Sequence, residues 1–171
     1  MSTSANFDYL QYISSTVDQK VVIRELMGAY GGDVWNFAFA LARSPEHADA
    51  ITQEAFVRAY RALPLFRGES SVKAWLLALT HSAAGSVKTS LLQRLPLRGK
   101  SGGADDPDND RMNASWRTVM ELPAKLREVL ILSAHHRLTI AEIAYVLDIS
   151  EETAKSRLHQ ARLKAIEAKG G

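Results

Sequence analysis

The chain has 171 residues, carries 21 Lys and Arg against 19 Asp and Glu, and contains no cysteine. This length is enough for one domain of roughly 150 residues or for two small domains. The absence of cysteine excludes disulfides, thiolate zinc sites and iron–sulfur clusters, and it suits a reducing cytoplasm. A net charge of +2 is too small to indicate a nucleic-acid partner by itself. The apolar runs are far shorter than the roughly 18 residues of a membrane span, so no membrane insertion is expected.

Apolar residues at helical spacing predict four helical segments in the first part of the chain. Two of them, residues 22–30 and 33–43, are separated by Gly31-Gly32, which predicts a break or kink. The third, over about residues 45–63, begins with an N-cap serine, a first-turn proline and a first-turn acid. The fourth begins at Ser70 or Ser71 and carries apolar residues four positions apart. No segment shows a convincing strand alternation.

The composition changes over residues 96–117, where a glycine-rich basic stretch is followed by an acidic one with almost nothing to bury. We interpret this segment as a flexible linker. After it, Leu122-Pro123 opens a helix, and Thr139 with Glu142 forms the pattern of a capping box. A tight turn at residues 148–150 then precedes a last helix over about residues 151–169. Two helices with a turn of this length predict a helix-turn-helix.

These elements predict an all-α fold of two small helical domains. The expected division is an N-terminal extension over residues 1–20, a first domain over residues 21–95, the linker over residues 96–117 and a helix-turn-helix domain over residues 118–171.

The last predicted helix offers a candidate face for reading DNA. A helix-turn-helix places its second helix in the major groove, where outward side chains contact base edges and flanking basic groups hold phosphates. The outward positions are Glu152, Thr153, Lys155, Ser156, His159 and Gln160, with Arg157 and Arg162 beside them. The alternative is a packing helix with a solvated basic face, and the pattern alone does not decide between the two.

The loop before the fourth helix combines an aromatic residue, a basic residue and a glycine in Phe66, Arg67 and Gly68. Such a loop can stack on an unpaired base and hold it. The alternative is structural, with Phe66 filling the helix junction and Gly68 turning the chain. On the preceding helix, Glu54 and Arg58 can pair at i, i+4 spacing, which is typical of a solvated face.

No residue pattern indicates catalysis, a cofactor or a metal site. The sequence contains neither a glycine-rich phosphate loop nor a Gly-x-Ser-x-Gly elbow. His135 and His136 are adjacent, and adjacent positions on a helix point in different directions. Neither has a histidine or carboxylate partner at i+4. We therefore expect that the protein is not an enzyme and that it holds no cofactor and no metal.

Five segments, taken in order, resemble the extracytoplasmic-function sigma factors of bacteria, a branch of the sigma-70 family. They are residues 49–60, 66–76, 122–130, 139–144 and 153–162. The resemblance runs from about Val22 to Ala168. It implies two helical domains, sigma-2 and sigma-4, joined by a flexible linker and bound to core RNA polymerase.

The resemblance also implies roles for particular residues. The residues implied to bind the clamp helices of the largest polymerase subunit are Asp49, Gln53, Glu54 and Arg58. Those implied to contact the minus-10 element are Phe66, Arg67, Gly68, Glu69, Ser70, Ser71, Lys73, Trp75, Ser82 and Ser86. Those implied to contact the minus-35 element are Thr153, Lys155, Ser156, Arg157, His159, Gln160 and Arg162.

The sequence departs from the family pattern at two places. Ser82 and Ser86 stand where the family commonly has asparagines on the helix after the capture loop, which questions promoter melting or minus-10 specificity. Asp148 stands where the helix-turn-helix turn often has glycine, and aspartate tolerates left-handed geometry better than most residues.

The function implied by the resemblance is that of an alternative sigma factor. It would bind core RNA polymerase through the clamp helices and the flap, recognise promoter DNA and initiate transcription in the cytoplasm, under the control of an anti-sigma factor. Two alternatives remain: a sigma-like decoy that titrates an anti-sigma factor, and a free-standing helix-turn-helix regulator.

Overall fold

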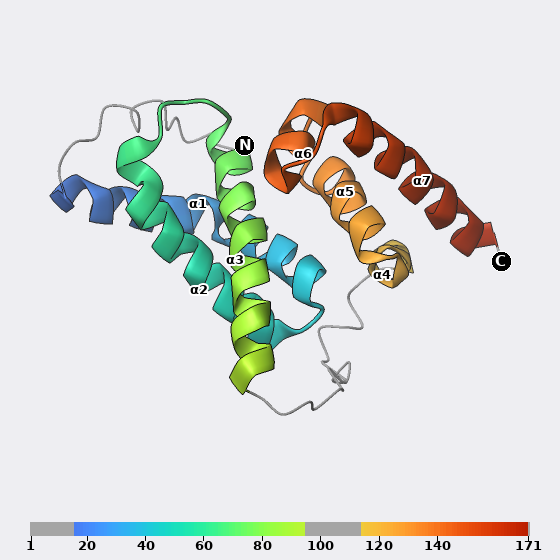
Figure 1. Cartoon of the computed structure of the whole chain (residues 1–171), viewed down its shortest axis with the longest axis horizontal. Coiled ribbons are helices and arrows are strands. Elements are labelled where there is room, and N and C mark those ends of the chain that lie inside the picture. The colour runs from blue at the N-terminus through green and yellow to red at the C-terminus, as the bar shows by residue number, and fades with distance from the viewer. Residues whose placement is uncertain (1–15, 95–113, 171) are drawn as a thin grey trace.

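The structure is a computed structural model that describes residues 16–94 and 114–170. These ranges form α-helices and one short 3-10 helix, η2, with no strand among them, which confirms the all-α fold (Figure 1). The helices are α1 Thr16–Ala42, α2 Pro45–Ala62, η2 Leu63–Leu65, α3 Val72–Arg94, α4 Ala114–Glu121, α5 Ala124–Ala134, α6 Ile140–Leu147 and α7 Glu151–Gly170. None of the helices in the described ranges combines the length and the apolar character that a bilayer crossing requires.

Helices α1 to α3 form an N-terminal unit. Helix α2 begins where local signals predict, whereas α1 begins at Thr16, inside the stretch expected to be an N-terminal extension. Ser44 caps α2 by accepting a hydrogen bond from the His47 backbone N–H at 3.4 Å, and Pro45 occupies the first turn. The predicted break at Gly31-Gly32 is wrong, because α1 is continuous through both glycines. A glycine costs a helix about 1 kcal/mol relative to alanine. Burial of Leu26 and Phe37 on either side of the pair, each 0% exposed, offsets that cost.

Helices α4 to α7 form a C-terminal unit that contains the predicted helix-turn-helix, α6 and α7. The capping box at the start of α6 is confirmed, since Thr139 and Glu142 exchange both of its hydrogen bonds. Asp148 adopts the left-handed conformation at φ 54°, which ends α6. Ser150 then accepts a hydrogen bond from the Thr153 N–H at 3.1 Å and so caps α7. Helix α4 begins at Ala114, inside the segment predicted as linker, and residues 95–113 of that segment lie outside the described residues.

The two units pack against each other instead of standing apart. Helices α1 and α3 contact α5 and α6, and one apolar cluster contains Phe37 and Leu77 together with core residues of the C-terminal unit such as Leu132. All three of these side chains are 0% exposed. Figure 1 shows α3 running alongside the C-terminal unit. This packing decides which of the predicted contact residues are accessible.

Candidate nucleic-acid interface

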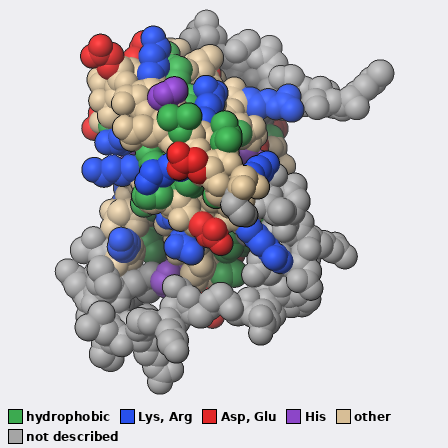
Figure 2. All heavy atoms as spheres, turned by 90° about the vertical axis from the view of Figure 1, so that its right-hand side faces the viewer, with side chains coloured by type: hydrophobic (Ala, Val, Ile, Leu, Met, Phe, Trp, Pro, Cys, Tyr) green, Lys and Arg blue, Asp and Glu red, His purple; other side chains and the backbone are tan. Residues whose placement is uncertain are grey.

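Helix α7 presents a polar face away from its own packing surface. Its inward residues Ala154, Leu158 and Ala161 are buried against α4, α5 and α6. The predicted base-reading residues that are exposed on α7 are Lys155, Ser156, His159, Gln160 and Arg162, while Thr153 and Arg157 are half-buried. On the side of the molecule where α7 lies, Lys and Arg side chains are interspersed with Asp and Glu (Figure 2). The side chains expected to read the minus-35 element are therefore accessible from solvent.

The loop before α3 divides into a buried anchor and an exposed tip. Phe66 is 5% exposed, and its ring lies against the Trp75 ring with the centroids 4.8 Å apart. Phe66 therefore fills the helix junction in this structure, as the structural alternative predicts. Arg67, Gly68 and Glu69 form the exposed tip. Gly68 has φ 79°, a left-handed conformation that favours glycine.

The tip of this loop is ordered by its own hydrogen bonds. The Arg67 guanidinium donates to the Pro64 carbonyl at 2.7 Å and to the Phe66 carbonyl at 3.1 Å. The Glu69 carboxylate accepts from the Arg67 backbone N–H at 3.2 Å. Leu65, just before the tip, is 75% exposed, although the sequence analysis did not single it out. A large exposed apolar side chain beside this loop is a further surface against which an extruded base can pack.

The start of α3 is engaged by the C-terminal unit. The Ser71 hydroxyl donates to the Glu142 carboxylate at 2.9 Å, and the Lys73 ammonium donates to the His136 carbonyl at 3.1 Å. Burial raises the pKa of Glu142, but hydrogen bonds from Thr139 and Ser71 outweigh it and lower that pKa below its ordinary value. Glu142 is therefore ionised near neutral pH and accepts from both units. Two residues expected to contact the minus-10 element thus hold the units together here.

Arg58 forms the predicted i, i+4 pair with Glu54 and also connects α2 to α3 through two hydrogen bonds that helical spacing does not predict. Its guanidinium donates to Glu54 at 3.0 Å, to the Ser82 hydroxyl at 2.8 Å and to the Ser86 hydroxyl at 2.7 Å. Arg58, expected to bind the polymerase, and the two serines, expected to lie near DNA, are therefore bound to each other. The hydroxyl groups of both serines accept hydrogen bonds in this network.

The remaining residues of the predicted polymerase face differ in their exposure and in their hydrogen bonding to the rest of the chain. The Asp49 carboxylate accepts a hydrogen bond from the Trp35 indole N–H at 2.8 Å. Glu54 is paired with Arg58 at 3.0 Å. Gln53 lies on the same side of α2, one turn after Asp49, and is exposed. Of this set, Gln53 is the side chain that α2 presents most openly to a partner.

Arg127 is a buried structural residue whose role in the contact between the units the sequence did not indicate. It is 6% exposed, and its Nε donates to the Ala40 carbonyl of α1 at 2.7 Å. Its Nη1 donates to the Leu122 carbonyl at 3.1 Å and to the Met120 carbonyl at 3.4 Å. Burial lowers the pKa of Arg127, and the nearby Arg43 adds to this effect. A guanidinium pKa starts so high that the group remains a cation. It donates to one carbonyl across the contact between the units, that of Ala40, and to two carbonyls of its own unit, those of Met120 and Leu122.

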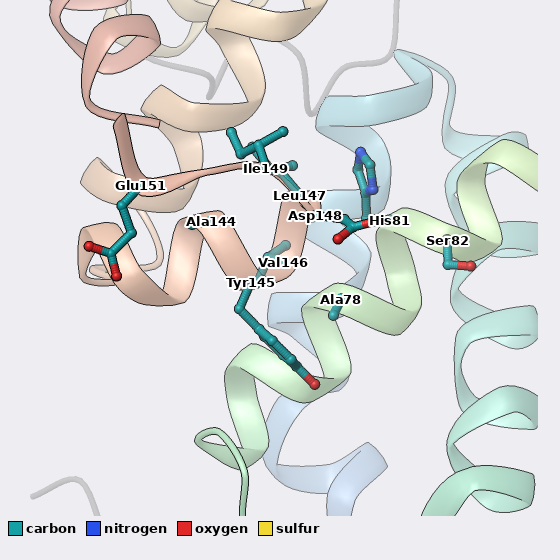
Figure 3. Close-up of a pocket in the computed structure, with 10 residues that line it drawn as sticks. All are labelled: Ala78, His81, Ser82, Ala144, Tyr145, Val146, Leu147, Asp148, Ile149 and Glu151. Carbon is teal, nitrogen blue, oxygen red and sulfur yellow. The ribbon is translucent and has the colours of Figure 1, made fainter. Parts of the chain in front are cut away.

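A pocket lies between α3 and the turn of the helix-turn-helix (Figure 3). Ala78, His81 and Ser82 of α3 line one side of it, and Tyr145, Asp148 and Glu151 line the other. His81 Nε2 also lies 3.8 Å from a Glu128 carboxylate oxygen. The pocket follows from the packing of the two units and belongs to the same interface.

Comparison with known families matches both units of this chain. The family model for Sigma-70 region 2 matches residues 26–86, and the model for Sigma-70, region 4 matches residues 114–164. The two models therefore cover the N-terminal helices and the helix-turn-helix unit in the order that the resemblance implied.

Curated relatives are sigma factors. The chain is 32% identical over 130 residues to the ECF RNA polymerase sigma-E factor of Escherichia coli K12, an alignment that covers 66% of this chain and 68% of the relative. The sigma-E factor of Salmonella typhimurium LT2 is 31% identical over the same length and coverage. The RNA polymerase sigma factor YlaC of Bacillus subtilis is 26% identical over 153 residues, with 83% of this chain and 88% of the relative covered.

Solved structures share the fold. The structure of CnrH in complex with the cytosolic domain of CnrY matches with a TM-score of 0.70 at 21% identity, over 95% of this chain and 96% of that one. The sigma factor RpoE of Bartonella quintana, in complex with the anti-sigma factor NepR, matches with a TM-score of 0.66 at 21% identity, over 86% of this chain and 96% of that one. With both regions present and a relative above 30% identity, the chain belongs to the extracytoplasmic-function sigma factors of the sigma-70 family.

Proposed function

We propose that this sigma factor binds core RNA polymerase in the cytoplasm and reads promoters with two separate surfaces. The C-terminal unit places α7 in the major groove of the minus-35 element, and the N-terminal unit holds the minus-10 element. The observation that carries this proposal is the exposed row of Lys155, Ser156, His159 and Gln160 on a capped helix whose opposite side is buried. Side chains that can donate and accept are what base edges in the major groove require.

Contact with both promoter elements requires the two units to separate. The elements are about 25 base pairs apart, which is about 85 Å of duplex at ~3.4 Å per base pair. A compact chain of 171 residues has a radius of gyration of only about 15 Å. The 19 residues from 95 to 113, fully extended, reach at most ~65 Å, so the connection and the breadth of both units together can span the gap. Separation also releases Ser71 and Lys73 for DNA.

The minus-10 surface in this proposal consists of the exposed tip at Arg67, Gly68 and Glu69, together with Leu65 and the released Lys73. Phe66 and Trp75 anchor the loop that carries this tip, since their rings are packed together. Arg58 positions Ser82 and Ser86 on the adjoining face of α3.

Asp49, Gln53 and Glu54 form the surface for the clamp helices of the polymerase, and the C-terminal unit meets the flap. We also propose an anti-sigma factor as a regulatory partner, because the solved relatives are sigma factors bound to CnrY and to the anti-sigma factor NepR.

Binding of purified core RNA polymerase to the full chain tests this function. We expect a complex between the sigma factor and the core enzyme that elutes together in gel filtration. A free-standing helix-turn-helix regulator would ignore core enzyme and bind operator DNA by itself. A decoy would bind an anti-sigma factor and would not support initiation. Failure to bind core enzyme would overturn the proposal.

Substitutions on α7 should separate phosphate contacts from base contacts. Gln160→Ala should change the preferred minus-35 sequence, because a lost base contact costs about 1–3 kcal/mol of discrimination at one base pair. Arg157→Ala should weaken all duplexes alike and reduce the salt dependence of binding, because a phosphate contact carries no sequence information. Selection of random duplexes bound by holoenzyme measures the preferred sequence, and titration of duplex at several salt concentrations measures the affinity and its salt dependence. Recovery of the same sequence from the wild type and from Gln160→Ala would contradict the assignment of Gln160.

Ser82→Asn should strengthen promoter opening. The asparagine carbonyl can accept the hydrogen bond that Arg58 now donates to Ser82, and the amide group remains free to donate to the melted strand. Permanganate reactivity of thymines in the bubble should rise, while core binding should not change. Ser82→Ala is the matched control, because it removes the acceptor without adding a donor. Equal reactivity of the wild type and Ser82→Asn would mean that this position does not touch the bubble.

A further inference from the structure

A cluster of metal-ligating groups lies where α1 meets the connection between α5 and α6. Asp33 of α1, His135 at the C-terminus of α5 and His136 each bring one ligand atom within 4.8 Å of the others. The Nδ1 atom of His136 lies 3.8 Å from Oδ1 of Asp33, which is too long for a hydrogen bond. The sequence pattern does not indicate Asp33 as a partner of the two histidines.

The two adjacent histidines converge because the chain leaves the helix at this point. His135 is the C-cap of α5, and Arg137 has φ 57°, a left-handed conformation that turns the backbone. Adjacent side chains diverge within a helix but need not diverge across its end. The two imidazole rings lie perpendicular to each other with their centroids 4.8 Å apart. Rings in this relation can direct nitrogen atoms to a common point.

His136 supplies a second, independent observation. Its side chain is buried at 2% exposure, and neither ring nitrogen has a hydrogen-bond partner among the described residues. Buried polar atoms are almost always paired. A buried imidazole whose unpartnered Nδ1 atom lies 3.8 Å from a carboxylate oxygen offers a ligand atom to a cation.

We propose that Asp33, His135 and His136 bind a borderline divalent transition metal such as Zn²⁺. Two imidazoles and one carboxylate are a ligand set that zinc takes, with water in the fourth position. Imidazole ligands disfavour Mg²⁺ and Ca²⁺, which prefer oxygen. Tetrahedral zinc needs its ligand atoms about 3.4 Å apart. Asp33 is half-exposed and His135 is exposed, so rotation of these two side chains can close the remaining distance to buried His136.

One nearby charge opposes the metal. The Lys73 ammonium donates to the carbonyl of His136 at 3.1 Å, so a cation bound by the imidazole lies near a positive charge. With three protein ligands and this repulsion, we expect a micromolar dissociation constant for Zn²⁺, weaker than that of four-ligand structural zinc sites.

Such a metal would join the two units. Asp33 belongs to the N-terminal unit and both histidines to the C-terminal unit, so the metal stabilises the packed arrangement over any arrangement in which the units separate. This inference stands on the geometry of the cluster and does not depend on the proposed promoter function.

Titration of the metal-free full-length chain with ZnCl2 tests the site. Isothermal titration calorimetry should give one equivalent of Zn²⁺ bound with micromolar affinity, and the melting temperature should rise with Zn²⁺ but not with Mg²⁺. Asp33→Asn and His135→Gln, two changes outside the core, should each weaken binding at least tenfold. His47→Gln is the matched control, because this histidine lies on α2 outside the cluster. The imidazole NMR signals of His135 and His136 should shift on binding, and those of His47 should not.

Absence of Zn²⁺ binding by the wild type would overturn the proposal, and so would His135→Gln or Asp33→Asn binding as tightly as the wild type. Shifts confined to His47 or His159 would place the metal elsewhere and would also overturn it. A circular dichroism spectrum identical to that of the wild type confirms that each variant is folded.

Discussion

Replacement of Arg127 by alanine should lower the free energy of unfolding by about 3 kcal/mol. Three backbone carbonyls, those of Ala40, Met120 and Leu122, would lose a charged donor in a buried place. Hydrogen bonds to charged groups contribute about 1.5–3 kcal/mol each, and buried acceptors left unpaired add a desolvation cost. Urea unfolding followed by circular dichroism measures the change.

The control for this prediction is Lys125→Ala. Lys125 lies on the same helix, α5, but is exposed, so its loss should change stability by less than about 0.5 kcal/mol. Arg127→Lys should not restore stability, because one ammonium cannot reach carbonyls that lie in two directions. A loss below about 1 kcal/mol in Arg127→Ala would contradict the role assigned to its hydrogen bonds.

The double substitution Gln53→Ala with Glu54→Ala should weaken binding to core RNA polymerase about a hundredfold. Each lost polar contact at an interface costs about 1–1.5 kcal/mol, and about 2.7 kcal/mol corresponds to two factors of ten. Folding should survive, because Gln53 is exposed, Glu54 is half-buried, and alanine is a strong helix former. Fluorescence anisotropy of labelled sigma factor with core enzyme measures the affinity.

Two variants separate docking from the Arg58 network. Gln53→Ala alone leaves the pair of Glu54 and Arg58 intact and should still weaken binding about tenfold. Thr52→Ala should have no effect, because the Thr52 hydroxyl donates to the Ala48 carbonyl of its own helix at 2.7 Å. Unchanged core binding of the folded double variant would mean that this side of α2 is merely solvated.

Local features of the fold could be predicted from the sequence because they depend on neighbouring residues. The N-cap at Ser44, the capping box of Thr139 with Glu142 and the left-handed Asp148 are all set within one helical turn. Ala154 and Leu158 of α7 are buried, as the helical spacing of the predicted outward residues requires. The prediction failed at Gly31-Gly32, because tertiary packing of the flanking apolar residues overrides the helix-breaking tendency of glycine.

Contacts between the units could not be predicted, because they join residues far apart in the chain. Arg127 and Ala40 are separated by 87 positions, and Ser71 and Glu142 by 71. Spacing along one helix carries no information on such pairs. The same limit applies to the Arg58 network, which spans 24 positions to Ser82. The accessible face of α7, by contrast, depends on helical periodicity alone and was predictable.

Run-off transcription with purified core RNA polymerase tests the central claim most directly. The chain is added to core enzyme on a library of genomic fragments, and the starts of the transcripts are mapped. We predict that discrete transcripts appear only when the chain is present, that their start sites share two upstream elements, and that the Gln53→Ala, Glu54→Ala variant abolishes them. The opposite result is that the folded chain gives no more transcription on any fragment than core enzyme gives alone. That result would contradict the assignment of this protein as a promoter-specificity subunit.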